Sequence, residues 1–223
     1  MYSVKEIFLT LQGEGGQAGI PAVFVRFAGC NLWSGLERDR ADAVCKFCDT
    51  DFIGTNGVGG GKFKTAQDLA VEIRSHWPKS GSQNADTDIW AVMTGGEPLL
   101  QLDEKLIEAC HAKGIKIAVE SNGTVAAPDG IDWLCISPKA DAQIVQTSGH
   151  ELKLVFPQTE NRPQDFEHMD FGIFSLQPRD DRFLKGDAGM FIGSPHREAA
   201  IAYCLAHPKW RLSLQTHKWM DIP

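Results

Sequence analysis

The sequence contains no run of about 18 apolar residues, the length that a membrane-spanning helix requires. Its first six residues are not typical of a signal peptide, because no apolar stretch follows a basic start. Basic residues are not in excess either, since 22 Lys and Arg against 29 Asp and Glu give a net charge of −7. A nucleic-acid-binding surface would need a basic patch. We therefore expect a cytoplasmic protein with a small-molecule substrate and neither a membrane span nor a nucleic-acid partner.

Cysteine is scarce, yet three of the six cysteines share one segment in a C-x14-C-x2-C pattern. Cys45 and Cys48 are spaced so that two thiolates can face one metal centre, and Cys30 can join them only through a folded-back loop. A structural zinc site usually takes four ligands, but the nearest histidine is His76. The pattern favours an iron–sulfur cluster with one open metal position. A zinc site and merely packed cysteines remain alternatives, and disulfides are not expected in a reducing compartment.

The remaining segments indicate a single α/β domain over residues 1–223. Segments rich in β-formers alternate with amphipathic ones, which predicts parallel βαβ units. We expect strands at 21–27, 89–93, 115–119, 133–136, 152–156, 171–176 and 211–214, and helices at 66–77, 102–113 and 195–206. Residues 4–11 form a mixed segment that we assign to no element, and residues 54–61 resemble a flexible glycine-rich loop without a phosphate-loop ending.

Polar or glycine-containing motifs follow the ends of five expected strands: Gly29-Cys30, Thr94 to Pro98, Glu120 to Gly123, Ser137 to Lys139, and Gln177 to Asp180. In a barrel of parallel strands, these ends open on one face, where ligands bind. Too few helices are expected for a full eight-fold barrel. The sequence therefore predicts an incomplete β/α barrel with its site at the carboxyl ends of the strands.

The cysteine pair with Phe47 between its members and the Gly-Gly-Glu-Pro motif at 95–98 resemble the radical S-adenosylmethionine (SAM) enzymes. That superfamily usually places three residues between the first two cysteines, where this chain has fourteen. Nearly the whole chain is similar to the 7-carboxy-7-deazaguanine synthase family, which includes members with such an expanded loop. The motifs that carry this similarity are Leu11 to Gly15, Phe27 to Trp33, Cys48 to Asp51, Thr94 to Pro98, Ser137 to Lys139 and Gln215 to Lys218.

The resemblance implies a role for each matching residue. Cys30, Cys45 and Cys48 would ligate a [4Fe–4S] cluster, and Thr50 would offer an oxygen to Mg²⁺. SAM would be held by Phe47, Gly96, Ser137, Pro138, Lys139, Gln177, Pro178, Arg179 and Asp180. The pterin substrate would be held by Leu11, Gln12, Gly13, Glu14, Arg26, Thr94 and His217.

The family contracts the ring of 6-carboxy-5,6,7,8-tetrahydropterin with loss of ammonia, giving the deazapurine core of queuosine-type nucleosides. This chemistry implies an electron donor such as flavodoxin or ferredoxin, and a homodimer is compatible with it. Two other functions stay open: a different radical SAM enzyme, such as a glycyl-radical activase, and a non-enzymatic zinc-binding module. Cys110, Cys135 and Cys204 lie in apolar patterns, and we expect them to be buried small hydrophobes.

The last nine residues end in Trp-Met-Asp-Ile-Pro, which is apolar enough to dock rather than to form a loose tail. They follow an expected strand, so they start near the other motifs. A docked carboxylate at Pro223 can accept hydrogen bonds from the amino-pyrimidinone edge of a pterin. We therefore predict that Pro223 contacts the substrate.

Overall fold

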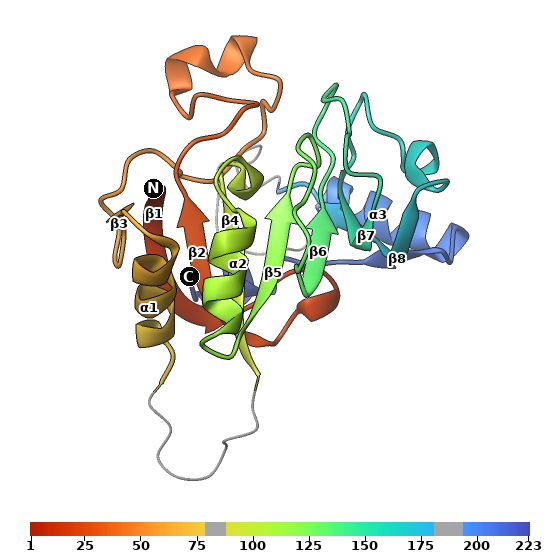
Figure 1. Ribbon diagram of the computed structural model, residues 1–223. Helices are drawn as coiled ribbons and strands as arrows, with labels where there is room; N and C mark the ends of the chain where they lie inside the picture. Colours follow the sequence, from red (N-terminus) through yellow and green to blue (C-terminus); the bar gives the residue numbers. More distant parts are fainter. Residues whose placement is uncertain (79–87, 181–193) are drawn as a thin grey trace.

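The computed structural model describes residues 1–78, 88–180 and 194–223. They form an open sheet with three α-helices packed against one face (Figure 1). From edge to edge, its nine strands are β3 (Gly61–Phe63), β1 (Tyr2–Leu11), β2 (Pro21–Phe27), β4 (Ile89–Gly95), β5 (Ile115–Ser121), β6 (Trp133–Ile136), β7 (Ser148–Phe156), β8 (Asp170–Pro178) and β9 (Trp210–Leu212). The α-helices are α1 (Ala66–His76), α2 (Glu104–His111), α3 (Pro195–Ala206) and the short α4 (Thr216–Met220). Four 3-10 helices complete this list: η1 (Gly15–Gln17), η2 (Glu37–Asp42), η3 (Pro98–Leu100) and η4 (Pro163–Phe166).

From β2 to β9 every neighbouring pair of strands runs parallel, so their carboxyl ends share one edge of the sheet. The sheet does not close, because β3 and β9 remain its two edges. The predicted incomplete β/α barrel is confirmed in this respect. The first edge differs from the prediction, since β1 runs antiparallel to both β2 and β3.

Strand β1 was missed because its side-chain alternation is broken. An irregularity between Val4 and Glu6 shifts the register with β2, so the two-residue period is lost where Lys5 and Glu6 lie together. The glycine-rich segment predicted to be a flexible loop is held against this same strand. Gly57 N donates to Lys5 O (2.9 Å), and Ile7 N donates to Val58 O (2.7 Å).

The hydrophobic core fills the space between the sheet and helices α1, α2 and α3. Val25, Met93 and Val119 belong to this core, so the residues that follow them in the strands face the other side. We call that other side, turned away from α1 to α3, the inner face. Helix α1 begins at the predicted cap: the Thr65 hydroxyl accepts from Asp68 N, and the Asp68 side chain bonds back to Thr65 N. No helix among residues 1–78, 88–180 and 194–223 has the length and apolar character to cross a membrane.

Candidate functional site

A row of functional side chains crosses the inner face at one level of the sheet. Arg26 in β2 pairs with Thr94 in β4, and Glu120 in β5 pairs with Cys135 in β6. Thr94 directly follows Met93, which pairs with Val119, so Glu120 is the next residue along the row. Cys135 in turn pairs with Glu151 in β7. The row therefore spans five adjacent strands, and only its first two members were predicted as site residues.

Cys135 is fully buried, as predicted, but it is more than a small hydrophobe. It pairs with Glu120 in the neighbouring strand, so its thiol lies near that carboxylate. Burial raises the pKa of Cys135 well above its ordinary value, and the nearby Glu120 carboxylate raises that pKa further. The thiol is thus held in its neutral form beside a carboxylate.

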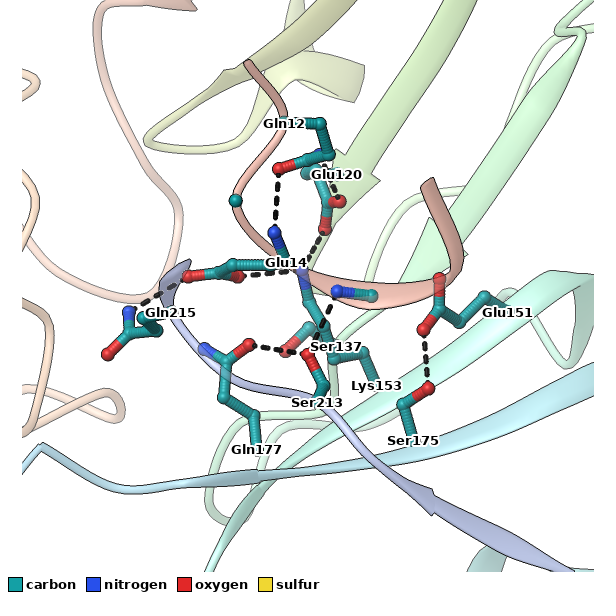
Figure 2. Close-up of polar contacts among 12 residues, drawn as sticks. Gln12, Glu14, Glu120, Ser137, Glu151, Lys153, Ser175, Gln177, Ser213 and Gln215 are labelled. Carbon is teal, nitrogen blue, oxygen red and sulfur yellow. Dashed lines mark hydrogen bonds and ion pairs between the residues drawn. The ribbon is translucent and has the colours of Figure 1, made fainter. Parts of the chain in front are cut away.

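Lys153 lies on the inner face beside the carboxylates of Glu14 and Glu120 (Figure 2). Its neighbours Leu152 and Leu154 belong to the core, so its own side chain points to the inner face, where it is only 4% exposed. The ammonium Nζ lies 2.8 Å from Glu14 Oε2 and 2.9 Å from Glu120 Oε2. Burial lowers the pKa of Lys153, but the two carboxylates outweigh burial and raise that pKa well above its usual range. Lys153 was not among the predicted site residues, although a lysine inside an apolar strand is a recognisable signal.

The segment that carries Glu14, residues 12–17, crosses the inner face, and we call it the crossing loop. It leaves β1 at Leu11, which pairs with Pro21 at the start of β2. Gly15 N donates to Ser213 Oγ (2.8 Å), and Gly16 N donates to Glu151 Oε2 (2.8 Å). Gly15 has a φ of 67°, and a Cβ there would lie 2.7 Å from Glu151 Oε2, so only glycine fits.

Glu14 lies between Lys153 and the C-terminal segment. Gln215 Nε2 donates to Glu14 Oε1 at 2.8 Å, while Lys153 holds the other oxygen. Burial alone would raise the pKa of Glu14. The charge of Lys153 and the hydrogen bonds from Lys153 and Gln215 outweigh burial and lower this pKa to about 2. Glu14 is therefore a partly buried carboxylate that stays ionised.

Helix α4 brings His217 to the crossing loop. Thr216 N donates to Gly13 O (2.9 Å), and a Cβ on Gly13 would lie 2.2 Å from Nδ1 of His217, so the imidazole packs directly on that glycine. Burial lowers the pKa of His217. Gln12 completes the group, because its Nε2 donates to Glu120 Oε1 at 3.3 Å. The structure thus brings together Gln12, Gly13, Glu14 and His217, all of which were predicted to hold the substrate.

Other predicted substrate residues have different surroundings. Arg26 pairs with Glu6, with its Nε 2.7 Å from Oε1, which supplies the partner that an arginine in this strand needs. Leu11 in β1 pairs with Pro21 at the start of β2, whereas Arg26 lies near the end of β2. Pro223 O accepts from Thr10 Oγ1 at 2.9 Å, so the C-terminal residues are docked on β1.

The expanded cysteine loop folds back on itself, which brings its distant cysteines together. Val44 N and Cys45 N both donate to Leu32 O, at 3.1 and 3.4 Å. Trp33, Ala43 and Phe52 form a small core of their own, against which Cys30 and Cys48 pack. Figure 1 shows this loop beyond the tips of β2 and β4.

Arg40 fixes the conformation of this loop. Its guanidinium lies 4.1 Å from the centre of the Trp33 ring, and Nη1 donates to Lys46 O (3.0 Å) and Cys48 O (3.1 Å). A charged residue among the fourteen residues between Cys30 and Cys45 therefore holds the Cys45–Cys48 turn against the small core.

The donor set of this loop fits an iron–sulfur cluster. A hydrogen bond between Cys45 and Cys48 raises the pKa of the former and lowers that of the latter to about 6, and burial raises the pKa of Cys30. Within the described residues, no three His, Cys, Asp or Glu side chains converge on a point that could hold one metal ion. A [4Fe–4S] cluster is bound through separate iron atoms, so its thiolates surround it instead of meeting at one ion. Three free thiols on one folded loop match that requirement.

The predicted SAM-binding motifs flank this loop. Lys139 lies close enough for its charge to lower the pKa of Cys45 and of Cys48, and its Nζ is hydrogen-bonded to Ser137 Oγ. The buried Gln158 shapes the turn, since its side chain donates to Pro138 O (3.3 Å) and accepts from Ala140 N (2.9 Å).

Gly96, which directly follows β4, packs against the backbone of Gly29, the residue before Cys30. A Cβ on it would lie 1.9 Å from Gly29 O, so a side chain is excluded. The neighbouring Glu97 is fully buried and accepts from Ser121 Oγ (2.9 Å) and Asn122 N (2.8 Å). Burial outweighs these bonds and raises the pKa of Glu97. Glu97 thereby ties the end of β4 to the end of β5.

Lys218 joins three segments at the carboxyl edge of the sheet. Its Nζ lies 2.9 Å from Asp49 Oδ2, 2.8 Å from Asp180 Oδ2 and 2.8 Å from Gln215 Oε1. A cavity beside it is lined by Pro178, Arg179, Asp180, Ser194, Arg197, Leu214, Gln215, Lys218 and Trp219. The turn from Gln177 to Asp180, which was predicted to bind SAM, therefore contacts the C-terminal segment. In the same turn, Arg179 Nη2 lies 3.4 Å from His196 Nε2 in α3.

Comparisons with known proteins agree with this geometry. No family model matches the chain. It is 58% identical to the 7-carboxy-7-deazaguanine synthase of Caulobacter vibrioides, an alignment covering 100% of this chain and 99% of the relative. The enzyme of the same name from Bordetella pertussis is also 58% identical, with the same coverage, and that from Bacteroides thetaiotaomicron is 36% identical. The crystal structure of QueE from Escherichia coli has the same fold, with a TM-score of 0.63, 22% identity, and coverage of 96% of this chain and 93% of that one.

Replacing Glu14 with Gln should lower the free energy of unfolding by on the order of 2 kcal/mol at neutral pH, because the buried Lys153 loses one of its two charged partners. The folded-state pKa of Glu14 is about 2, below the ordinary 4.5. Its stabilisation is therefore complete above about pH 4.5 and is lost as the pH falls toward 2. Urea unfolding of the metal-free protein should show the difference between wild type and variant shrinking from about pH 5 to pH 3.

The matched control is Glu160→Gln, which changes an exposed glutamate. It should alter the free energy of unfolding by less than about 0.5 kcal/mol. A Glu14→Gln effect that stays constant across this acidic range would contradict the ionised, paired state of Glu14.

Proposed function

Because the chain belongs to the family of 7-carboxy-7-deazaguanine synthases, we propose that it converts 6-carboxy-5,6,7,8-tetrahydropterin to 7-carboxy-7-deazaguanine by radical ring contraction with loss of ammonia. The observation that carries this proposal is the 58% identity over the full length of two relatives of that name. The resemblance predicted from the motifs is confirmed. The folded-back cysteine loop and the polar inner face give the proposed reaction a place in the structure.

Family membership implies a [4Fe–4S] cluster and SAM. We assign the cluster to Cys30, Cys45 and Cys48, and SAM to the turns that contain Gly96, Ser137 to Lys139, and Gln177 to Asp180. When bound, the reduced cluster and SAM supply the radical that removes a hydrogen atom from the substrate. The carboxyl ends of the parallel strands place these turns on one edge of the sheet, beside the cysteines.

The protein's own contribution is binding and exclusion of water. The crossing loop covers part of the inner face, and the ionised Glu14 offers an acceptor to the N–H groups of a pterin. Glu120 lies in the row with Thr94 and shares Lys153 with Glu14, so we add it to the substrate-binding set. The ion pair between Arg26 and Glu6 keeps a guanidinium in β2, at the end of the row that begins with Arg26 and Thr94.

Other parts of the proposal concern Mg²⁺, the electron donor and the assembly. Thr50 is half-buried directly after the cysteine loop, beside the exposed carboxylate of Asp49, and Mg²⁺ prefers such oxygen ligands and water. Reduction of the cluster requires a one-electron donor, for which flavodoxin and ferredoxin are the candidates. A cytoplasmic location and a homodimer complete the proposal.

The function is tested by anaerobic incubation with SAM, a reductant, Mg²⁺ and the carboxy-tetrahydropterin, with mass spectrometry for the deazapurine. Cys30→Ala, Cys45→Ala and Cys48→Ala should each abolish SAM cleavage, because each removes a cluster ligand. Cys110→Ala and Cys204→Ala are the controls and should cost stability only. Full turnover by Cys45→Ala would refute the ligand assignment, and about one zinc per chain without acid-labile sulfide would favour the zinc-module alternative.

Thr50→Ala should raise the Mg²⁺ concentration needed for half-maximal turnover by roughly tenfold, because one oxygen ligand is lost. Titrating turnover with Mg²⁺ in both proteins measures this change. Thr55→Ala serves as the control, since it changes a threonine outside the Cys48–Asp51 motif. Equal activity of the wild type with and without a chelator would remove the metal from the proposal.

Appending a few residues after Pro223 should raise the KM for the pterin at least about tenfold and leave iron and sulfide content unchanged. The added chain moves the carboxylate that we propose as a hydrogen-bond acceptor for the substrate. A wild-type KM in the extended protein would show that residues 221–223 only pack on β1.

A further inference from the structure

Lys153 binds two carboxylates that come from different parts of the chain. Glu14 belongs to the crossing loop and Glu120 to the end of β5, while the lysine itself lies in β7. Both Nζ–O distances are below 3.0 Å, at 2.8 and 2.9 Å, and the lysine side chain is 4% exposed. The lysine is therefore a buried cross-link between the crossing loop and two strands of the sheet.

Two partly buried carboxylates this close to one ammonium repel each other, and repulsion favours protonation of one of them. Burial raises the pKa of Glu120 and the charge of Glu14 adds to that rise, whereas the ammonium lowers it. Without the ammonium, the two carboxylates would move apart or share a proton. The titratable groups that face this centre are Glu14, Glu120, Cys135, Glu151 and His217.

We propose that Lys153 is a positioning residue, which keeps Glu14 and Glu120 ionised and at a fixed separation so that both can accept hydrogen bonds from the pterin. It acts through the two carboxylates and not by direct contact with the reacting atoms, because both of its observed ion pairs are made to them. Gln215 and Gln12 hold the outer sides of the same two carboxylates, at 2.8 and 3.3 Å. This inference rests on the proposed function.

The test compares Lys153→Met with Lys153→Arg in the anaerobic holoenzyme, with KM, kcat and the pH profile of kcat/KM measured for 6-carboxy-5,6,7,8-tetrahydropterin. Lys153→Met should raise KM at least about tenfold and move the acidic limb of kcat/KM upward by about one pH unit, because the carboxylates then bind protons more readily. Lys153→Arg keeps the charge but changes the geometry. It should therefore leave the acidic limb in place and raise KM by a smaller factor.

Lys116→Met is the matched control, since Lys116 in β5 pairs with Asp88 at 2.6 Å, away from the crossing loop. Its KM, pH profile and iron content should equal those of the wild type. A wild-type KM and pH profile in folded Lys153→Met would overturn the inference. If Lys153→Met does not fold, Lys153→Arg decides: a raised KM with an unmoved acidic limb supports the inference, and a wild-type KM overturns it. A wild-type protein that forms no deazapurine would instead refute the proposed function, which separates the two failures.

Discussion

The two ion pairs of the buried Lys153 are the interaction on which the inner face depends. This sheet is open, and the crossing loop is held across its inner face by side chains together with the backbone bond from Thr216 N to Gly13 O. Removing one of the two carboxylates is destabilising, because the buried ammonium is left with incomplete charge compensation. The ion pair between Lys153 and Glu14 at 2.8 Å therefore holds the loop together with the hydrogen bonds that Gly15 N and Gly16 N donate to Ser213 and Glu151.

The expanded cysteine loop is also held in place by contacts between residues far apart in the sequence, but by a different set of interactions. Fourteen residues between Cys30 and Cys45 would leave the two thiols far apart in an extended chain. The two backbone bonds to Leu32 O, the small core around Trp33 and the guanidinium of Arg40 bring the ends of the insertion together. The insertion is thus a folded unit, and Lys218 ties it to the rest of the site through Asp49.

Much of the fold could be predicted from the sequence because local signals were clear. The cap at Thr65 and the apolar strands after residue 20 carry their own periodicity. Strand β1 could not be recognised, since the irregularity after Val4 removes its alternation. The motifs at the strand ends correctly indicated one edge of the sheet, and the family resemblance supplied Glu14 and His217. Glu151 was missed because its importance comes from a contact across the sheet, which no local pattern reveals. Lys153 carries a local signal, a charged residue inside an apolar strand, but only its contact with Glu14 shows what it does.

The contacts of the crossing loop with the C-terminal segment also have a consequence for synthesis of the protein. Glu14 and Gln215 are 201 positions apart, and Gly13 and Thr216 are 203 apart. At typical translation rates, the loop emerges from the ribosome roughly 10 to 40 s before its partners exist. During that interval the carboxylates of the inner face remain open to solvent, and Asp49 beside the cysteines lacks Lys218, which lies 169 positions later. Contacts between residues this far apart in the sequence also slow folding. The nascent chain thus displays the free thiols of Cys30, Cys45 and Cys48 before its site is complete. A cluster inserted at that stage would be exposed to solvent. Insertion after residues 213–218 have docked would protect the cluster.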